Sequence, residues 1–251
     1  MTEAPPPRRI VPEAGPHLWH AEALSPADWM LPLGVEAAAE AQAAAPGAAL
    51  PRLDPLLSRV AERLLHGKGF VLLRGLPLPE DPGALLRLLG ARIGEVMLFP
   101  AGEGSLFNEP CDMLLLLCTD STTMTLHSAA AVHNALLKTD RAALEAFYQP
   151  LPQASGGLEV PVFAVSSGVF SARLDRDAIA HGLAPEALAA LDQALEASGP
   201  PLNLPLRPGD VLGINPFLVW ASRVRSAVAQ PLRAREDSRL AEGAFAGMLR
   251  S

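Results

Sequence analysis

The sequence has few cysteines and no long apolar stretch. Only two cysteines, Cys111 and Cys118, occur among its 251 residues. Their odd spacing would place them on opposite faces of one strand, so we expect no disulfide and interpret both as buried, reduced thiols. The longest unbroken apolar run, Met113–Cys118, is far shorter than the roughly 18 residues that span a membrane. We therefore expect no membrane as a partner.

The sequence also lacks an excess of positive charge. Its Lys and Arg residues number 20 and its Asp and Glu residues 27, which gives a net charge of −7. Domains that bind nucleic acids usually carry a basic patch, so we expect no nucleic acid as a partner. No apolar segment follows Arg8 and Arg9. This pair is therefore not part of an export signal, and a cytoplasmic protein is expected.

Apolar residues and turn-forming residues are plentiful instead. Hydrophobic residues make up 49% of the chain, enough for a sizeable core, and 25 prolines with 20 glycines indicate many turns. Residues 1–16 are polar and rich in proline, so we expect a flexible N-terminal arm there. The rest shows no internal repeat and no sharp change of composition. Residues 17–251 are therefore expected to form a single domain.

Helical and extended patterns both occur along this domain. Helices are predicted at 36–45, 54–66, 82–89, 140–147 and 185–197; the second is the clearest, because Asp54 can cap it and Pro55 takes its first position. A strand at 70–74 is followed by short apolar runs between turns, at 94–99, 112–118, 123–128, 160–165, 168–174, 204–206, 211–214 and 217–221. This pattern is typical of an α+β protein built around a sandwich or jelly roll.

Several segments, in their order and spacing, resemble one known family. They are Trp19 to Trp29, Gly69 to Pro77, Cys111-Asp112 with Leu116 to Cys118, Ser128 to Leu136, Leu151-Pro152, Ser171 to Arg173 with Arg176, and Arg207 to Asp210 with Ile214-Asn215. Together they resemble the TauD/TfdA-like family of iron(II)- and 2-oxoglutarate-dependent dioxygenases, over roughly residues 17–240. The resemblance implies a double-stranded β-helix, a cupin-like jelly roll with helices packed outside it.

The resemblance also implies a metal site, which this chain does not preserve. In the family two histidines and one carboxylate hold iron and leave positions for 2-oxoglutarate and oxygen. Here the family's His-x-Asp position reads Phe107-x-Glu109, and Ala221 stands at the position of the second histidine. The last histidine of the chain is His181, so no later residue can replace that ligand locally. We therefore expect no bound metal and no cofactor.

A substitute metal site is a second possibility. It would combine Glu109 with His127 and His133, which flank the altered strand. Against it, strand alternation predicts that His127 faces away from Met124 and Ser128. The interpretation of His133 that needs no metal is a hydrogen-bonded structural residue.

Some of the positions that the resemblance assigns to ligand binding carry a residue suited to that role, and others do not. Met124 stands where the family has the hydroxyl that holds 2-oxoglutarate, while Arg235 and Arg239 match its closing arginine pair and Arg223 its His-x-Arg remnant. Arginine can grip a carboxylate with two parallel hydrogen bonds. The full set of expected ligand-binding residues is Met124, Ser128, Asn215, Arg223, Arg235 and Arg239; Ser128 is equally interpreted as a residue at a strand end.

Three functional hypotheses follow. The first is a catalytically degenerate family member, a pseudoenzyme that binds a small carboxylate metabolite near Arg223 or a protein partner, such as an active paralogue, in a homo- or hetero-oligomer. The second is an enzyme that reuses the pocket for metal-independent chemistry, with Glu109 as general acid or base. The third is an active oxygenase with other ligands, which would need iron(II) and 2-oxoglutarate.

Overall fold

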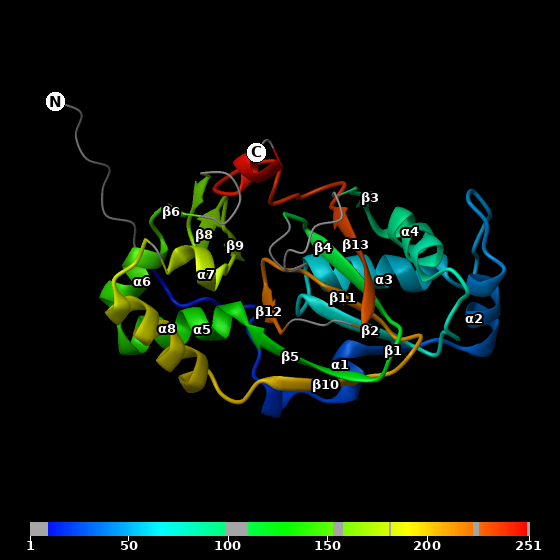
Figure 1. Cartoon of the computed structure of the whole chain (residues 1–251), viewed down its shortest axis with the longest axis horizontal. Coiled ribbons are helices and arrows are strands. Elements are labelled where there is room, and N and C mark those ends of the chain that lie inside the picture. The colour runs from blue at the N-terminus through cyan, green and yellow to red at the C-terminus, as the bar shows by residue number, and fades with distance from the viewer. Residues whose placement is uncertain (1–9, 99–109, 153–157, 181, 223–225, 250–251) are drawn as a thin grey trace.

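The computed structural model describes residues 10–98, 110–152, 158–180, 182–222 and 226–249. Two sheets face each other, with helices packed outside them, as Figure 1 shows. The larger sheet has the strand order β1-β2-β11-β4-β13-β3. Its strands are β1 (Met30–Pro32), β2 (Phe70–Arg74), β3 (Glu95–Val96), β4 (Met113–Cys118), β11 (Val211–Ile214) and β13 (Ala227–Arg233). Only β1 and β2 pair in parallel among the described strands.

The large sheet is buried on both faces. On β4 all six residues are buried, and they alternate between two apolar clusters. Leu114, Leu116 and Cys118 belong to the cluster that lies toward the second sheet, and Met113, Leu115 and Leu117 to the other. The second cluster also holds residues of α2 (Val35–Gln42), α3 (Asp54–Leu65) and α4 (Pro82–Ile93). These helices therefore cover the outer face of the sheet.

The small sheet closes the space in front of the large one. It consists of β10 (Leu202–Leu206), β5 (Thr122–Ser128) and β12 (Val219–Ala221), in that order. Met124, Leu126 and Leu204 are fully buried on its inner face, whereas Thr123 and Asn203 on its outer face are exposed. This alternation is the one expected for a sheet with one solvated face. We call the space between the two inner faces the barrel interior.

Helices and short strands complete the other half of the molecule. Figure 1 shows α5 (Ala129–Thr139), α6 (Arg141–Phe147) and α8 (Pro185–Ala197) side by side there, next to the hairpin of β8 (Phe163–Ser166) and β9 (Val169–Ala172). The remaining elements are η1 (Ala21–Ala23), α1 (Pro26–Trp29), β6 (Leu151–Pro152), β7 (Glu159–Val160), α7 (Arg176–Ile179) and η3 (Ala246–Leu249).

A C-terminal strap joins the two halves. We give this name to residues 234–248, which leave the end of β13 and cross to the β8–β9 hairpin (Figure 1, red). Leu240, Phe245 and Met248 of the strap are buried in a separate apolar cluster with Ala164 of β8 and Phe217. The strap is therefore packed into the fold through its own small core.

Most predicted elements are present, with some corrections. The helix predicted at 54–66 is confirmed, and β8 and β9 pair as a hairpin around Ser167. The helix predicted at 82–89 extends to Ile93, and the strand predicted at 94–99 is only Glu95–Val96 in the described part. The run predicted at 160–165 is divided between β7 and β8. Helix α5 and strand β13 are additions that the periodicity did not indicate.

The N-terminal segment also differs from the expectation. Residues 1–9 lie outside the described residues, but the predicted loose arm does not hold for residues 10–16. Ile10 is buried in the larger apolar cluster, and Glu13 exchanges two hydrogen bonds with the side chain of Asn134 on α5, at 2.7 and 2.9 Å. The Asn134 amide thus bonds the backbone N–H and C=O of Glu13 as a neighbouring strand would. This attaches the N-terminal segment to helix α5.

Two further features bear on the sequence predictions. Cys111 and Cys118 are both buried free thiols. Burial, and secondarily the charge of Asp210, raises the pKa of Cys118 to about 11, so this thiol stays protonated at neutral pH. None of the helices in the described residues is long and apolar enough to cross a bilayer.

Candidate functional site

The barrel interior is the place where the sequence resemblance puts a ligand. Its walls are the inner faces of β4, β11 and β13 on one side and of β5, β10 and β12 on the other. Leu116 of β4, Met124 of β5 and Leu212 of β11 all lie in one apolar cluster, at 1%, 0% and 0% exposure. The described part of these walls is therefore apolar and densely packed.

The structure brings two of the predicted positions together. Ala221 of β12 pairs with Leu126 of β5, and Met124 lies two residues before Leu126 on the same face. Residues that pair directly across two antiparallel strands share a face, so Ala221 and Met124 both lie toward the barrel interior. These two positions, which the sequence resemblance assigns to an imidazole and to a cosubstrate hydroxyl, carry a methyl group and a thioether on one wall. Phe107, Glu109 and Arg223 lie outside the described residues.

Asn215 is placed in the fold rather than in the pocket. Its side chain is fully buried, donates to the carbonyl of Leu64 at 3.0 Å and accepts from the backbone N–H of Phe217 at 3.0 Å. These bonds use both ends of the amide and attach the turn after β11 to helix α3. These bonds give Asn215 a structural role, and its ligand contact stays a prediction.

Ser128 also has a structural role, and its part in ligand binding stays a prediction. It ends β5 and caps helix α5, because its Oγ accepts from the N–H of Ala131 at 3.2 Å. The same hydroxyl donates to the carbonyl of His17 at 2.7 Å, and the residue is 2% exposed. With its donor and an acceptor occupied in this way, Ser128 serves the strand-to-helix junction.

The predicted arginine pair is separated. Arg235 points to the end of helix α4, where its guanidinium donates to the carbonyls of Ala91, Arg92 and Gly94. Cations at a helix C-terminus satisfy carbonyls that lack intrahelical partners. Arg235 is therefore a helix-capping residue on the surface, and its contact with a ligand stays a prediction.

Arg239 lies in a different environment, on the strap. Its Nε donates to Ser171 Oγ of β9 at 3.0 Å, and its backbone N–H donates to Asp112 Oδ1 at 2.9 Å. Burial lowers the pKa of the Arg239 guanidinium, while Asp112 and Asp237 oppose that effect. An arginine side chain nevertheless keeps its positive charge at neutral pH. Neither of its two Nη groups has a hydrogen-bond partner among the described residues.

Asp112 is the residue that positions this part of the strap. It is fully buried, and its Oδ2 accepts from the N–H of Ala234 at 2.9 Å and from Ser238 Oγ at 2.7 Å. These hydrogen bonds attach the first residues of the strap to the Asp112 carboxylate. The sequence showed Asp112 only as part of a family-like pair, and its partners, more than 120 positions away, were not predictable from a local pattern.

Two further arginines lie close to this point in the fold. Arg233 ends β13, one residue before the Ala234 that Asp112 binds, and its Nε is buried without a hydrogen-bond partner in the described residues. Arg173 follows β9, two residues after the Ser171 that Arg239 contacts, and is 6% exposed. The strap therefore places Arg239 between the ends of two strands that each carry an arginine. We call Arg173, Arg233 and Arg239 the arginine cluster.

The two histidines that a substitute metal site would need are apart from each other in the fold. His127 lies on the outer face of β5, paired with Trp220, as strand alternation predicted. His133 is fully buried in α5, where Nε2 is 2.9 Å from the Tyr148 hydroxyl and Nδ1 is 3.1 Å from Asn134 Oδ1. Burial lowers the pKa of both imidazoles. The described residues contain no group of three or more His, Cys, Asp or Glu side chains arranged to hold a metal ion.

Comparison with known proteins identifies the fold. No protein-family model and no curated protein sequence matches the chain. Among solved structures, asparagine oxygenase is similar with a TM-score of 0.55 and 16% identity, over 84% of this chain and 90% of that one. PvcB from Pseudomonas aeruginosa gives 0.52 and 18%, over 76% and 84%. The iron oxygenase OrfP, bound to iron and α-ketoglutaric acid, gives 0.52 and 20%, over 83% and 90%.

These likenesses establish the architecture. The chain has the TauD/TfdA-like fold of the iron- and 2-oxoglutarate-dependent oxygenases, an α+β double-stranded β-helix with peripheral helices. The predicted fold class is therefore confirmed. At 16 to 20% identity the similarity concerns the fold alone.

Proposed function

We propose that this chain is a non-oxidising protein of the oxygenase fold, a pseudoenzyme that acts by binding a small carboxylate at the arginine cluster. The observation that carries the proposal is the apolar inner wall at Met124 and Ala221, the positions that the sequence resemblance assigns to the cosubstrate hydroxyl and the second imidazole. The arginine cluster supplies positively charged side chains at the rim of the same barrel.

The side chains at these positions do not fit an iron site. Ferrous centres of this class need two imidazoles and one carboxylate on one side of the metal. A methyl group offers no lone pair, and a thioether is a soft ligand that suits Cu(I) better than Fe(II). Glu109 alone would leave a weak, oxygen-only site. We therefore derive no reaction through iron for this chain.

Arg239 has the properties of a carboxylate-binding residue. Its guanidinium is held at Nε by Ser171, which leaves the two Nη groups as a planar pair of donors. The side chain is partly dehydrated by burial, and this strengthens its attraction for an anion that replaces water. Arg173 and Arg233 add positive charge at the neighbouring strand ends. We include Arg223 as a fourth arginine of the binding site.

The test has an oxidation arm and a binding arm. Anaerobic addition of iron(II) and 2-oxoglutarate to the purified chain is expected to give no metal-to-ligand charge-transfer absorption, and aerobic incubation no succinate. Calorimetric titration with 2-oxoglutarate, and with succinate, is expected to show metal-independent binding. Arg239→Met should weaken that binding at least about tenfold, because a charge-assisted bidentate contact contributes roughly 1.5–3 kcal/mol.

Arg176→Gln is the matched control. Arg176 is a nearby arginine, but it is half exposed and pairs with Asp192 on the surface at 2.6 Å. Its loss should leave the affinity for 2-oxoglutarate unchanged. A charge-transfer band or succinate formation would show that the chain is an oxygenase. Equal affinities of Arg239→Met and the unsubstituted chain would show that the arginine cluster is not the binding site.

A further inference from the structure

The inner face of strand β13 is accessible, although β4, β5 and β11 are closely packed. From Ala229 to Arg233 the residues of β13 alternate between partly exposed and buried. The buried Leu232 belongs to the apolar cluster under the helices, whereas Ala227 and Ala229 pack against the cluster between the sheets. The partly exposed residues of β13 therefore face the barrel interior. A side chain that faces inward and is still accessible borders an open space.

The side chains beside this open space are small and apolar. Ala227, Ala229 and Pro231 form the inner row of β13. Ala221 of β12, which is also partly exposed, faces the barrel interior from the small sheet. Larger side chains at these positions would take up the space instead. We call the accessible part of the barrel interior beside β13 the inner hollow.

Positive charge lies at one end of the inner row. Arg233 is the last residue of this row, and its buried Nε has no hydrogen-bond partner in the described residues. Arg239 lies at the same end, because its backbone N–H binds Asp112, which also binds the N–H of Ala234. Ala229 lies four residues, about 13 Å, further along the strand. The inner hollow therefore leads from the arginine cluster to apolar side chains.

The cation at the other end of the large sheet is already paired. Arg74 ends β2 on the face that also carries Phe70 and Leu72, both members of the cluster between the sheets. Its guanidinium donates to Asp210 at 2.6 Å. The register places Asp210 beside the Cys118 end of β4, away from Arg233. On the inner faces that the structure describes, a ligand would therefore find available positive charge at one end of the hollow.

We propose that the ligand of the arginine cluster is a monocarboxylate with an apolar body, such as a medium-chain alkanoate. Its carboxylate binds Arg233 and Arg239, and its apolar part lies in the inner hollow. This inference rests on the proposed function. A second carboxylate on the apolar part would lie among methyl groups, where burial of an unpaired charge is unfavourable. An alkyl chain in the same place is stabilised by leaving water.

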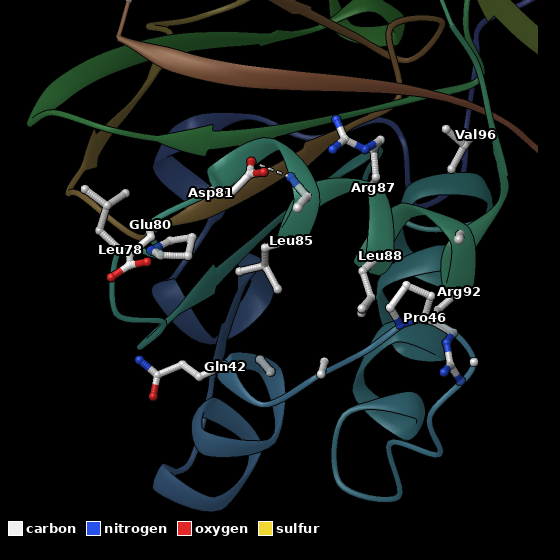
Figure 2. Close-up of a pocket in the computed structure, with 16 residues that line it drawn as sticks. Gln42, Pro46, Leu78, Glu80, Asp81, Leu85, Arg87, Leu88, Arg92 and Val96 are labelled. Atoms are coloured by element: carbon white, nitrogen blue, oxygen red, sulfur yellow. Dashed lines mark hydrogen bonds between the residues drawn. The ribbon is translucent and has the colours of Figure 1, made fainter.

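A larger apolar groove on the outer side of the large sheet suits a carboxylate less well. Its volume is about 850 Å³, and Figure 2 shows Leu85 of α4 pointing into it. The charged residues of its lining include two acids, Glu80 and Asp81. Arg92, one of its two arginines, is paired with Asp54 at 3.1 Å. The groove offers an apolar surface without an excess of positive charge, and it therefore serves as the control site.

Calorimetric titration of the full chain with acids of matched length tests the proposal. Octanoate is expected to bind at least about tenfold more tightly than suberate, which differs only in its second carboxylate. Hexanoate should likewise bind more tightly than adipate. From hexanoate to octanoate, the affinity should rise by up to about fourfold for each added CH₂ group. Equal or tighter binding of the diacids, or an affinity that does not rise with chain length, would overturn the proposal.

Two variants with the same substitution locate the alkyl chain. Ala229→Leu fills the inner hollow and should weaken octanoate binding at least about tenfold, while 2-oxoglutarate, which stays at the arginine cluster, binds as before. Ala84→Leu is the matched control, because Ala84 is exposed and lines the outer groove. It should leave both affinities unchanged. Circular dichroism confirms that both variants are folded. Loss of octanoate binding in Ala84→Leu and not in Ala229→Leu would place the chain in the groove and overturn the proposal.

The failure of this inference can be distinguished from the failure of the proposed function. If none of these acids binds, or if Arg239→Met leaves their affinities unchanged, the arginine cluster is not a carboxylate site and both proposals are wrong. If 2-oxoglutarate binds and depends on Arg239, but suberate binds as tightly as octanoate, the proposed function stands and the inference on the ligand class is wrong. The titrations of the unsubstituted chain decide this without any variant of the inner hollow.

Discussion

At the residue scale, His133 is a buried base that the fold keeps neutral. It is 0% exposed, its Nε2 contacts the Tyr148 hydroxyl, and the rings of Phe163 and Phe170 lie 5.3 and 5.6 Å from it. Burial lowers the pKa of His133 below its ordinary value of 6.5, although Asn134 and Glu13 partly oppose this. The unfolded chain therefore takes up a proton at a higher pH than the folded chain does.

This difference predicts a loss of stability in mild acid. The free energy of unfolding should fall as the pH drops below 6.5 and continue to fall until the folded-state pKa is reached. The slope is at most about 1.4 kcal/mol per pH unit for each such group. His127, whose pKa burial also lowers, contributes in the same direction. Urea denaturation from about pH 7.5 to about pH 5 measures the slope.

His133→Phe is the variant that isolates this contribution. It should be less stable than the unsubstituted chain at neutral pH, because the hydrogen bond between the imidazole and the Tyr148 hydroxyl is lost. Its pH dependence should nevertheless be shallower. Identical slopes for the two proteins would show that His133 does not titrate differently in the folded and unfolded states.

The sequence predicted single site residues unevenly, and the reason is the distance to their partners. Strand alternation placed His127 on the face of β5 opposite to Met124, because that pattern is local, and the structure agrees. Ser128, Asn215 and Arg235 were assigned to ligand binding, whereas their hydrogen bonds go to His17, Leu64 and the end of α4, more than 100 positions away in each case. A local pattern cannot distinguish a free polar group from one that a distant segment satisfies.

At the scale of the element, helix α5 depends on its first residue. Ser128 caps the helix and also bonds the carbonyl of His17, which belongs to the N-terminal segment. Seven of the eleven residues of α5 are buried, including a run of small alanines that lets neighbouring elements approach closely. The start of α5 therefore connects the barrel, the helical half and the N-terminal segment.

Ser128→Ala tests this role against a role in ligand binding. Loss of the cap and of the second hydrogen bond should lower the free energy of unfolding by about 1–2 kcal/mol. The affinity for 2-oxoglutarate should stay unchanged, since both contacts of the hydroxyl are within the fold. Denaturant unfolding and calorimetric titration of the same preparation give the two values. A loss of affinity for 2-oxoglutarate without a loss of stability would show that Ser128 takes part in ligand binding.

The elements that the sequence failed to predict have weak local patterns. Helix α5 begins with an alanine run directly after an apolar strand, without the proline or glycine that usually separates elements. Strand β13 contains Pro231. A proline argues against a central strand, because proline has no backbone N–H group to donate to a neighbouring strand. Its partners β4 and β3 supply the missing context.

At the scale of the whole molecule, the C-terminal strap couples the two halves. It is anchored to the large sheet by Asp112 and to the β8–β9 hairpin by Phe245, whose ring lies 5.0 Å from that of Phe217. Arg239 lies between these anchors. The strap therefore holds the central residue of the arginine cluster in position.

Phe245→Ala should weaken both the fold and the site. Removal of a fully buried phenylalanine costs about 3–5 kcal/mol of unfolding free energy, unless the cluster around it collapses. Because Arg239 depends on the same strap, the affinity for 2-oxoglutarate should fall as well. Thermal unfolding and titration measure the two effects, with Glu242→Ala, an exposed strap residue, as the control. Unchanged binding would separate the strap from the ligand site.

The order of the strands was beyond the reach of sequence periodicity. The pattern of short apolar runs indicated a jelly roll, but it did not show that β11 lies between β2 and β4. Such pairings join segments that are far apart along the chain, and only the complete apolar surface of each sheet selects them.

The sulfur atoms on the barrel walls carry a final consequence. Met124 and Cys118 both belong to the apolar cluster between the sheets. Thioethers and thiols are the protein groups most readily converted to sulfoxides and sulfenic acids. Any reactive oxygen species generated inside this barrel would attack its own lining first. Under the proposed function no such species arises inside the barrel, which is compatible with sulfur atoms on its walls.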